Sequence, residues 1–98
     1  MEINKSKKDD DLIIELAGRL DTVTAPQFEA AIRESIEGVK NLTIDFASLE
    51  YVSSAGLRVL LMAQKQMNKQ GNMKLINVSE PIKEVFDMTG FSDILTIE

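Results

Sequence analysis

The sequence predicts a single α/β domain over residues 1–98, built on a mixed β-sheet. Strand-like runs and amphipathic helical stretches follow one another in the order β-β-α-β-α-β-α-β. The strand–helix–strand units imply parallel strands with right-handed crossovers. The first two strands are joined by a short charged connection, which favours an antiparallel hairpin. With 98 residues, the chain has the common size of one domain.

The first half of the chain is expected to hold the hairpin and one helix. Residues 2–7 predict a weak edge strand, and residues 11–17 predict a stronger strand whose apolar residues alternate. A loop is expected over residues 18–23. The helix opens with Thr24 as N-cap and Gln27 completing a capping box. An apolar stripe follows, and the opposite face, which carries Glu29 and Arg33, is expected to be solvated; the stripe is Phe28, Ile32, Ile36 and Val39.

The second half alternates strands and helices to the end of the chain. A half-buried strand is expected over residues 41–47, and a helix over 55–70 that stops at Gly71 as the C′ residue. The start of this helix is apolar nearly all round, so it should be its most buried part. A strand over 73–78 follows, then a third helix with Ser79 as its cap and Gly90 at its end. Residues 93–98 predict a short last strand.

Ser53 and Ser54 occupy the position where a strand end turns into a helix start. The backbone N–H groups of a helix start have no intrahelical partner, and they form the positive end of the helix dipole. Two interpretations stay open for these hydroxyls: capping of the helix, or a phosphorylatable position at an exposed helix tip. Ala55 and Gly56 are small residues in the first turn. They allow close approach by a neighbouring chain or a ligand.

Composition excludes several classes of function. The net charge of −5 argues against direct binding of nucleic acid, and the absence of Cys and His removes thiol chemistry and the commonest general base. No phosphate-binding glycine loop or set of metal ligands is present. The acidic run over residues 9–11 lacks the spacing of a calcium loop and fits a hairpin turn. We therefore expect no enzyme activity, no cofactor, no metal and no membrane insertion, and the cytoplasm as location.

Three segments resemble the STAS domain family (sulfate transporter and anti-sigma factor antagonist). The first is YVSSAGLRVLL at residues 51–61, and the second is Gly18-Arg19-Leu20-Asp21, which TVTAP and a helix follow. The third is INVSEP at residues 76–81, with VFDMTG behind it. They come in the family's order and span nearly the whole chain. The resemblance implies a STAS fold with its helices mainly on one face of the sheet.

The small bacterial members of this family antagonise anti-sigma factors, and the resemblance implies the same role here. It places the phosphoacceptor at Ser54 rather than Ser53, and Asp21 near it, although capping of its own turn would also explain Asp21. The usual Asp of the motif is replaced by Ser53. The implied partners are an anti-sigma factor with serine kinase activity, which would bind any nucleotide, and a serine phosphatase. The implied contact residues are Asp21, Thr22, Ser53, Ser54, Ala55, Gly56 and Arg58.

A second function remains open on the same resemblance. Some STAS domains are constitutive adaptors, as subunits of a lipid transporter or within signalling assemblies. In such a domain the segment around Ser54 is a docking tip that needs no modification. The residue at position 53 favours this alternative, whereas the small, lone domain favours the phosphorylated switch.

Overall fold

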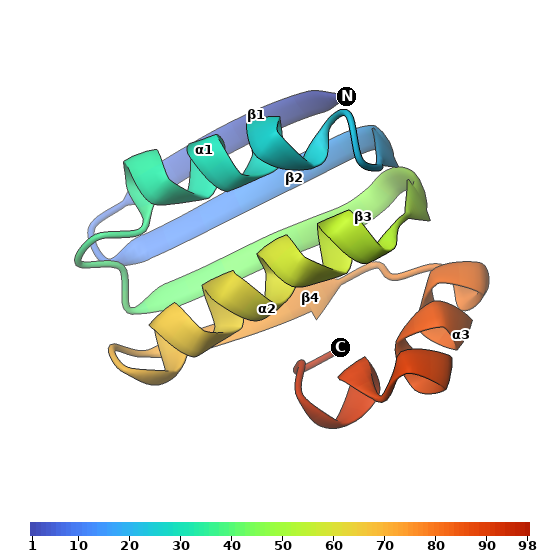
Figure 1. Cartoon of the computed structure of the whole chain (residues 1–98). Coiled ribbons are helices and arrows are strands. Elements are labelled where there is room, and N and C mark those ends of the chain that lie inside the picture. Colours follow the sequence, from blue (N-terminus) through green and yellow to red (C-terminus); the bar gives the residue numbers. More distant parts are fainter.

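The computed structural model describes residues 1–98 and contains one four-stranded sheet in the order β1-β2-β3-β4 (Figure 1). β1 and β2 pair antiparallel, and β2–β3 and β3–β4 pair parallel, which confirms the mixed sheet. The strands are β1 (Glu2–Lys8), β2 (Asp11–Leu20), β3 (Asn41–Val52) and β4 (Asn72–Ile76). The helices are α1 (Ala25–Ser35), α2 (Ser54–Asn68) and α3 (Glu80–Thr89), followed by a 3-10 helix over Phe91–Asp93.

The core lies between the sheet and the helices α1 and α2, and it extends to Ile82 and Phe86 of α3. α1 and α2 lie side by side over one face, and α3 lies beyond α2 near the β4 edge (Figure 1). Alternate residues of β2 and β3 point into this core, as the period of two in the sequence predicts. These residues are all buried: Leu12, Ile14, Leu16, Leu42, Ile44 and Phe46. The predicted placement of the helices mainly on one face is therefore correct.

The second and third strands are longer than expected. β2 continues to Leu20 and β3 to Val52, and these two residues are partners in the parallel ladder. The expected loop over residues 18–23 is thus wrong for its first three positions. Gly18, with φ of 100°, lies where the ladder changes register, so it is a glycine within an irregular strand and not the start of a loop. The longer strands bring the β2–α1 turn to the start of α2.

The predicted end of α2 at Gly71 is wrong, because α2 ends at Asn68 with Lys69 as its C-cap. Gly71 lies in the turn that follows. It does not have the positive φ of a left-handed C′ residue. A Cβ atom at this position would lie 2.0 Å from the backbone oxygen of Lys40. The backbone N–H of Asn72 donates to the same oxygen at 2.8 Å. Glycine is therefore required because the turn into β4 packs directly on the start of β3.

Other element ends also differ from the sequence prediction. The last strand is wrong: residues 91–93 form a 3-10 helix, and the following segment makes a single parallel bridge, Leu75 to Ile97. The contact with β4 is short: the Leu75 N–H donates to the Thr96 carbonyl at 2.9 Å, and the Glu98 N–H donates to the Leu75 carbonyl at 2.9 Å. β4 itself ends at Ile76, because Asn77 adopts a φ of 57°. Gly90 ends α3 as predicted, and its φ of 81° is left-handed.

Candidate functional site

Ser53 and Ser54 have different roles at the turn from β3 into α2. Ser53 is extended, and its Oγ accepts a hydrogen bond from the Gly56 N–H at 3.4 Å, which makes it the N-cap. Its carbonyl accepts the first helical hydrogen bond, from the Leu57 N–H at 2.9 Å. Ser54 is the first residue of α2, and its side chain is exposed and takes part in no intramolecular hydrogen bond. Capping therefore falls to Ser53, and the Ser54 hydroxyl is free.

Gly56, in the first turn of α2, packs closely against Leu20 at the end of β2. It is buried, and a Cβ atom there would lie 2.6 Å from Leu20 Cγ and 3.2 Å from the Leu20 carbonyl oxygen. That same carbonyl accepts a hydrogen bond from the Ser53 N–H at 2.8 Å. The neighbour that approaches Gly56 is therefore Leu20 of the same chain. Of the expected contact residues, Gly56 positions the tip of α2, whereas Ser54 and Arg58 lie exposed on it.

The capping box before α1 is formed by Asp21 and Thr24, and not by Thr24 and Gln27 as predicted. The Thr24 N–H donates to Asp21 Oδ1 at 3.0 Å, and the Asp21 N–H donates to Thr24 Oγ1 at 2.9 Å. The backbone of Thr24 is already helical, and its side chain makes no cap bond to α1. The predicted capping box is thus wrong by one turn, since Asp21 also suits an N-cap. This supports the interpretation in which Asp21 caps its own turn.

The Asp21 carboxylate is already engaged within its own turn. The N–H groups of Thr24 and Val23 both donate to Oδ1 at 3.0 Å, and Arg19 Nε lies 3.9 Å from Oδ2. These contacts, the Thr24 N–H first, lower the pKa of Asp21 below its ordinary value of 3.8. The Arg19 guanidinium also lies over the Tyr51 ring, 4.3 Å from its centroid. Asp21 is therefore a negatively charged side chain that its own turn holds in place.

Stability should depend on the ionisation of Asp21. Because the folded pKa lies below the unfolded one, its contribution is present above about pH 4 and is lost as the pH falls through the folded pKa. Asp21→Asn should therefore unfold at lower urea concentration than wild type at pH 7. This gap should shrink as the pH falls below 4, in urea titrations followed by circular dichroism. A gap that stays constant from pH 7 to pH 3 would contradict this role.

An open groove of about 480 Å³ lies between α1 and the first half of α2, beside the turn that carries Ser54. Thr22, Ala55 and Arg58, three of the expected contact residues, line it. Glu29 and Arg33 line it as well and pair with each other at 2.9 Å. From the sequence we expect these two residues on a solvated face, because their spacing of four residues carries no information about the neighbouring helix. Ala55, which lines the groove, directly follows the exposed Ser54. We call the groove together with the start of α2 at Ser54 the Ser54 surface.

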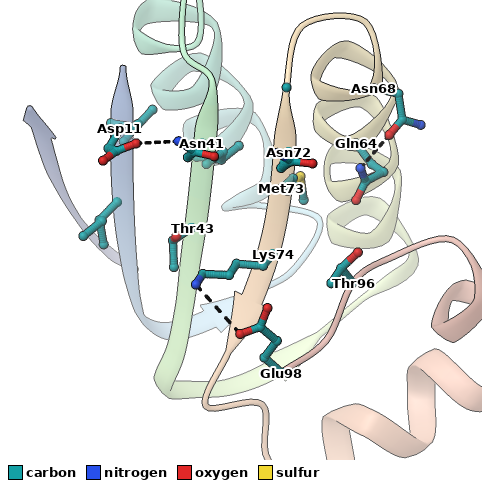
Figure 2. Close-up of a pocket in the computed structure, with 14 residues that line it drawn as sticks. Asp11, Asn41, Thr43, Gln64, Asn68, Asn72, Met73, Lys74, Thr96 and Glu98 are labelled. Carbon is teal, nitrogen blue, oxygen red and sulfur yellow. Dashed lines mark hydrogen bonds and ion pairs between the residues drawn. The ribbon is translucent and has the colours of Figure 1, made fainter. Parts of the chain in front are cut away.

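A second, larger hollow of about 570 Å³ lies at the opposite end of the parallel strands, where β2, β3 and β4 begin (Figure 2). None of the predicted site residues lines it. Its polar side chains largely pair with one another, as Asn41 does with Asp11 at 2.7 Å and Lys74 with Glu98 at 3.8 Å. Neither hollow brings together three acidic side chains that could hold a metal ion. The Ser54 surface is therefore the stronger candidate site.

Comparison with known proteins identifies the family. The STAS domain model matches residues 2–98, and the chain belongs to this family. It is 34% identical over 99 residues to BtrV of Bordetella bronchiseptica, covering 99% of this chain and 85% of that protein. It is 31% identical over 98 residues to the anti-sigma-B factor antagonist of Bacillus subtilis, covering 99% of this chain and 90% of that protein. The resemblance seen in the sequence is confirmed.

Solved structures support the same fold. The chain superposes on the anti-sigma factor antagonist SpoIIAA in its unphosphorylated form with a TM-score of 0.84 at 22% identity, covering 99% of this chain and 88% of that one. For SpoIIAA of Bacillus in its phosphorylated form the TM-score is 0.77, at 22% identity over 99% of this chain and 91% of that one. None of the helices here has the length and apolar character needed to cross a membrane.

Proposed function

We propose that this protein is an anti-sigma factor antagonist controlled by phosphorylation of Ser54. The unphosphorylated protein binds an anti-sigma factor. This binding frees the sigma factor that the anti-sigma factor had held. One observation carries the proposal: Ser54 presents a free hydroxyl at the exposed start of α2, in a chain that matches an anti-sigma-B factor antagonist over nearly its whole length. The protein is then a regulatory binding protein and not an enzyme.

The position of Ser54 suits a switch that acts on an interface. A phosphoserine adds about −1.5 to −2 charges at pH 7. At the first position of α2 this charge faces free backbone N–H groups and the positive end of the helix dipole, so the fold tolerates it. The added charge lies beside the groove between α1 and α2. A partner seated there would have to bury it, which weakens docking.

The partners of this protein are then an anti-sigma factor and a serine phosphatase. The anti-sigma factor is a serine kinase that supplies the bound nucleotide, because this chain has no phosphate-binding glycine loop. A serine phosphatase restores the binding form. The protein contacts no nucleic acid directly, since its net charge is −5. A protein that controls a sigma factor acts where transcription takes place, so we place it in the cytoplasm.

Phosphorylation by the anti-sigma factor kinase of the same organism tests this proposal. With ATP, the wild-type protein should gain one phosphate, which mass spectrometry should map to Ser54. Ser54→Ala should gain none. Ser53→Asp keeps an oxygen that can cap Gly56 and restores the residue usual in the family, so its phosphorylation rate should not fall. Phosphate on Ser53 in the wild type would contradict the assignment.

The constitutive adaptor remains the second candidate, because Ser53 stands where the family motif usually has Asp. In that case the partner is a subunit of a transporter or of a signalling assembly, and Ser54 is a contact residue only. A wild-type protein that gains no phosphate, but whose Ser54 surface still binds its partner, would favour the adaptor.

A further inference from the structure

Val23 is an apolar side chain held almost fully in solvent beside the Ser54 surface. It is 85% exposed, and among the large apolar residues only Met88, at 86%, is comparable. Single exposed apolar side chains are common in proteins and need no special explanation. Two further features of Val23 call for one: the rigidity of the turn that carries it, and the surface that adjoins it.

The turn that carries Val23 is fixed by hydrogen bonds within a few residues. The Val23 N–H itself donates to Asp21 Oδ1 at 3.0 Å, and the capping box joins Asp21 to Thr24. The Thr24 hydroxyl donates to the Arg19 carbonyl at 2.7 Å, and the Ala25 N–H donates to the Asp21 carbonyl at 2.8 Å. Val23 contributes nothing to the core in return. A fixed backbone lowers the entropy lost when such a side chain is bound.

The surroundings of Val23 continue the Ser54 surface. Its neighbours Thr22 and Ala25 line the groove between α1 and α2, together with Arg58. Arg58 is exposed and has no ion pair, although Glu29 lines the same groove and pairs with Arg33 instead. The surface thus offers one unpaired cation, Arg58, in a groove lined partly by alanines, and one exposed apolar side chain, Val23, on a fixed turn whose neighbouring residues line the same groove.

We propose that Val23 is the apolar anchor of the docking surface, and that the anti-sigma factor covers it with an apolar pocket while a carboxylate faces Arg58. This inference rests on the proposed function and adds the chemistry of the partner's surface. Binding anchors are central, desolvated side chains that fill a pocket of the partner, and they are more often Trp, Tyr or Arg than Val. Val23 is chosen for its exposure on a fixed turn, whereas Arg58 is of a common anchor type. The opposing carboxylate follows from charge complementarity, because Arg58 has no acidic partner within the chain.

Matched substitutions at equally exposed positions test the anchor. Val23→Glu should weaken binding of the purified anti-sigma factor at least tenfold, measured by calorimetry with unphosphorylated protein. Val23→Thr keeps the shape of the side chain and should weaken it several-fold. Met88→Glu, on α3 near the β4 edge of the sheet, makes the same change at the same exposure and should stay within twofold of wild type. Urea midpoints should match wild type for all three variants.

The electrostatic part is tested on α2. Arg58→Glu should weaken binding at least tenfold, whereas Lys65→Glu, an exposed basic residue near the end of the same helix, should stay within twofold. If the wild type binds the anti-sigma factor and Val23→Glu, Val23→Thr and Arg58→Glu bind equally well, the inference is wrong and the proposed function stands. A wild-type protein that neither binds nor is phosphorylated would overturn the proposed function, and this inference with it.

Discussion

Leu60→Ala is expected to lower the free energy of unfolding by about 2–5 kcal/mol, the usual range for a truncated core leucine. Leu60 lies in the first half of α2 and is fully buried in the main apolar cluster. Its side chain fills the space between this helix and the sheet. Because the surrounding residues are closely packed, they cannot move far enough to fill the cavity that the truncation would leave. Urea unfolding at pH 7, followed by circular dichroism, measures the loss.

Leu61→Ala is the matched control for this substitution. Leu61 is the next residue of the same helix and is only half-buried, so its truncation removes less buried surface. Its effect should be clearly smaller than that of Leu60→Ala. Equal losses at the two positions, or an unchanged midpoint for Leu60→Ala, would show that α2 turns a different face to the sheet.

The core could be predicted because it depends on local periodicity. The alternation in β2 and β3 and the apolar start of α2 identify the inward faces without knowledge of their neighbours, and Leu60 is an example. Strand ends depend on pairing between distant segments. Residues 18–20 of β2 begin with a glycine and look like a loop in the sequence, but pairing with β3 makes them part of the strand. The requirement for glycine at position 71 depends on the distant Lys40 carbonyl in the same way.

The sequence indicates where the candidate site lies in the chain, but not which residue has which role. Two serines at a strand-to-helix turn indicate a cap and a free hydroxyl, yet both suit either role. The backbone decides, because Ser53 is extended and Ser54 is the first residue of the helix. The capping box was misplaced because Asp21-x-x-Thr24 and Thr24-x-x-Gln27 overlap in the sequence. Nothing in the sequence distinguishes Val23, whose exposure follows from the turn that Asp21 fixes.

Ser54→Asp should separate folding from docking. An anion at the first position of α2 is favourable by about 0.3–1 kcal/mol, so the variant should fold at least as stably as wild type. Binding of the anti-sigma factor should nevertheless fall at least about 100-fold, because an uncompensated charge buried at an interface costs several kcal/mol. Ser54→Ala adds no charge and loses no cap, since Ser53 supplies the cap, and it should bind nearly as tightly as wild type.

The control for Ser54→Asp is the same change at another helix start. Ser79 is the exposed N-cap residue of α3, and its side chain makes no cap hydrogen bond. Ser79→Asp therefore adds one negative charge in a similar electrostatic environment outside the proposed docking surface. Its affinity should stay within about twofold of wild type, since a charge outside an interface acts mainly through screened, long-range forces. If Ser79→Asp weakened binding as much as Ser54→Asp, the overall charge of the protein would explain the loss. If Ser54→Asp bound as tightly as wild type, phosphate at this position could not switch the partner off.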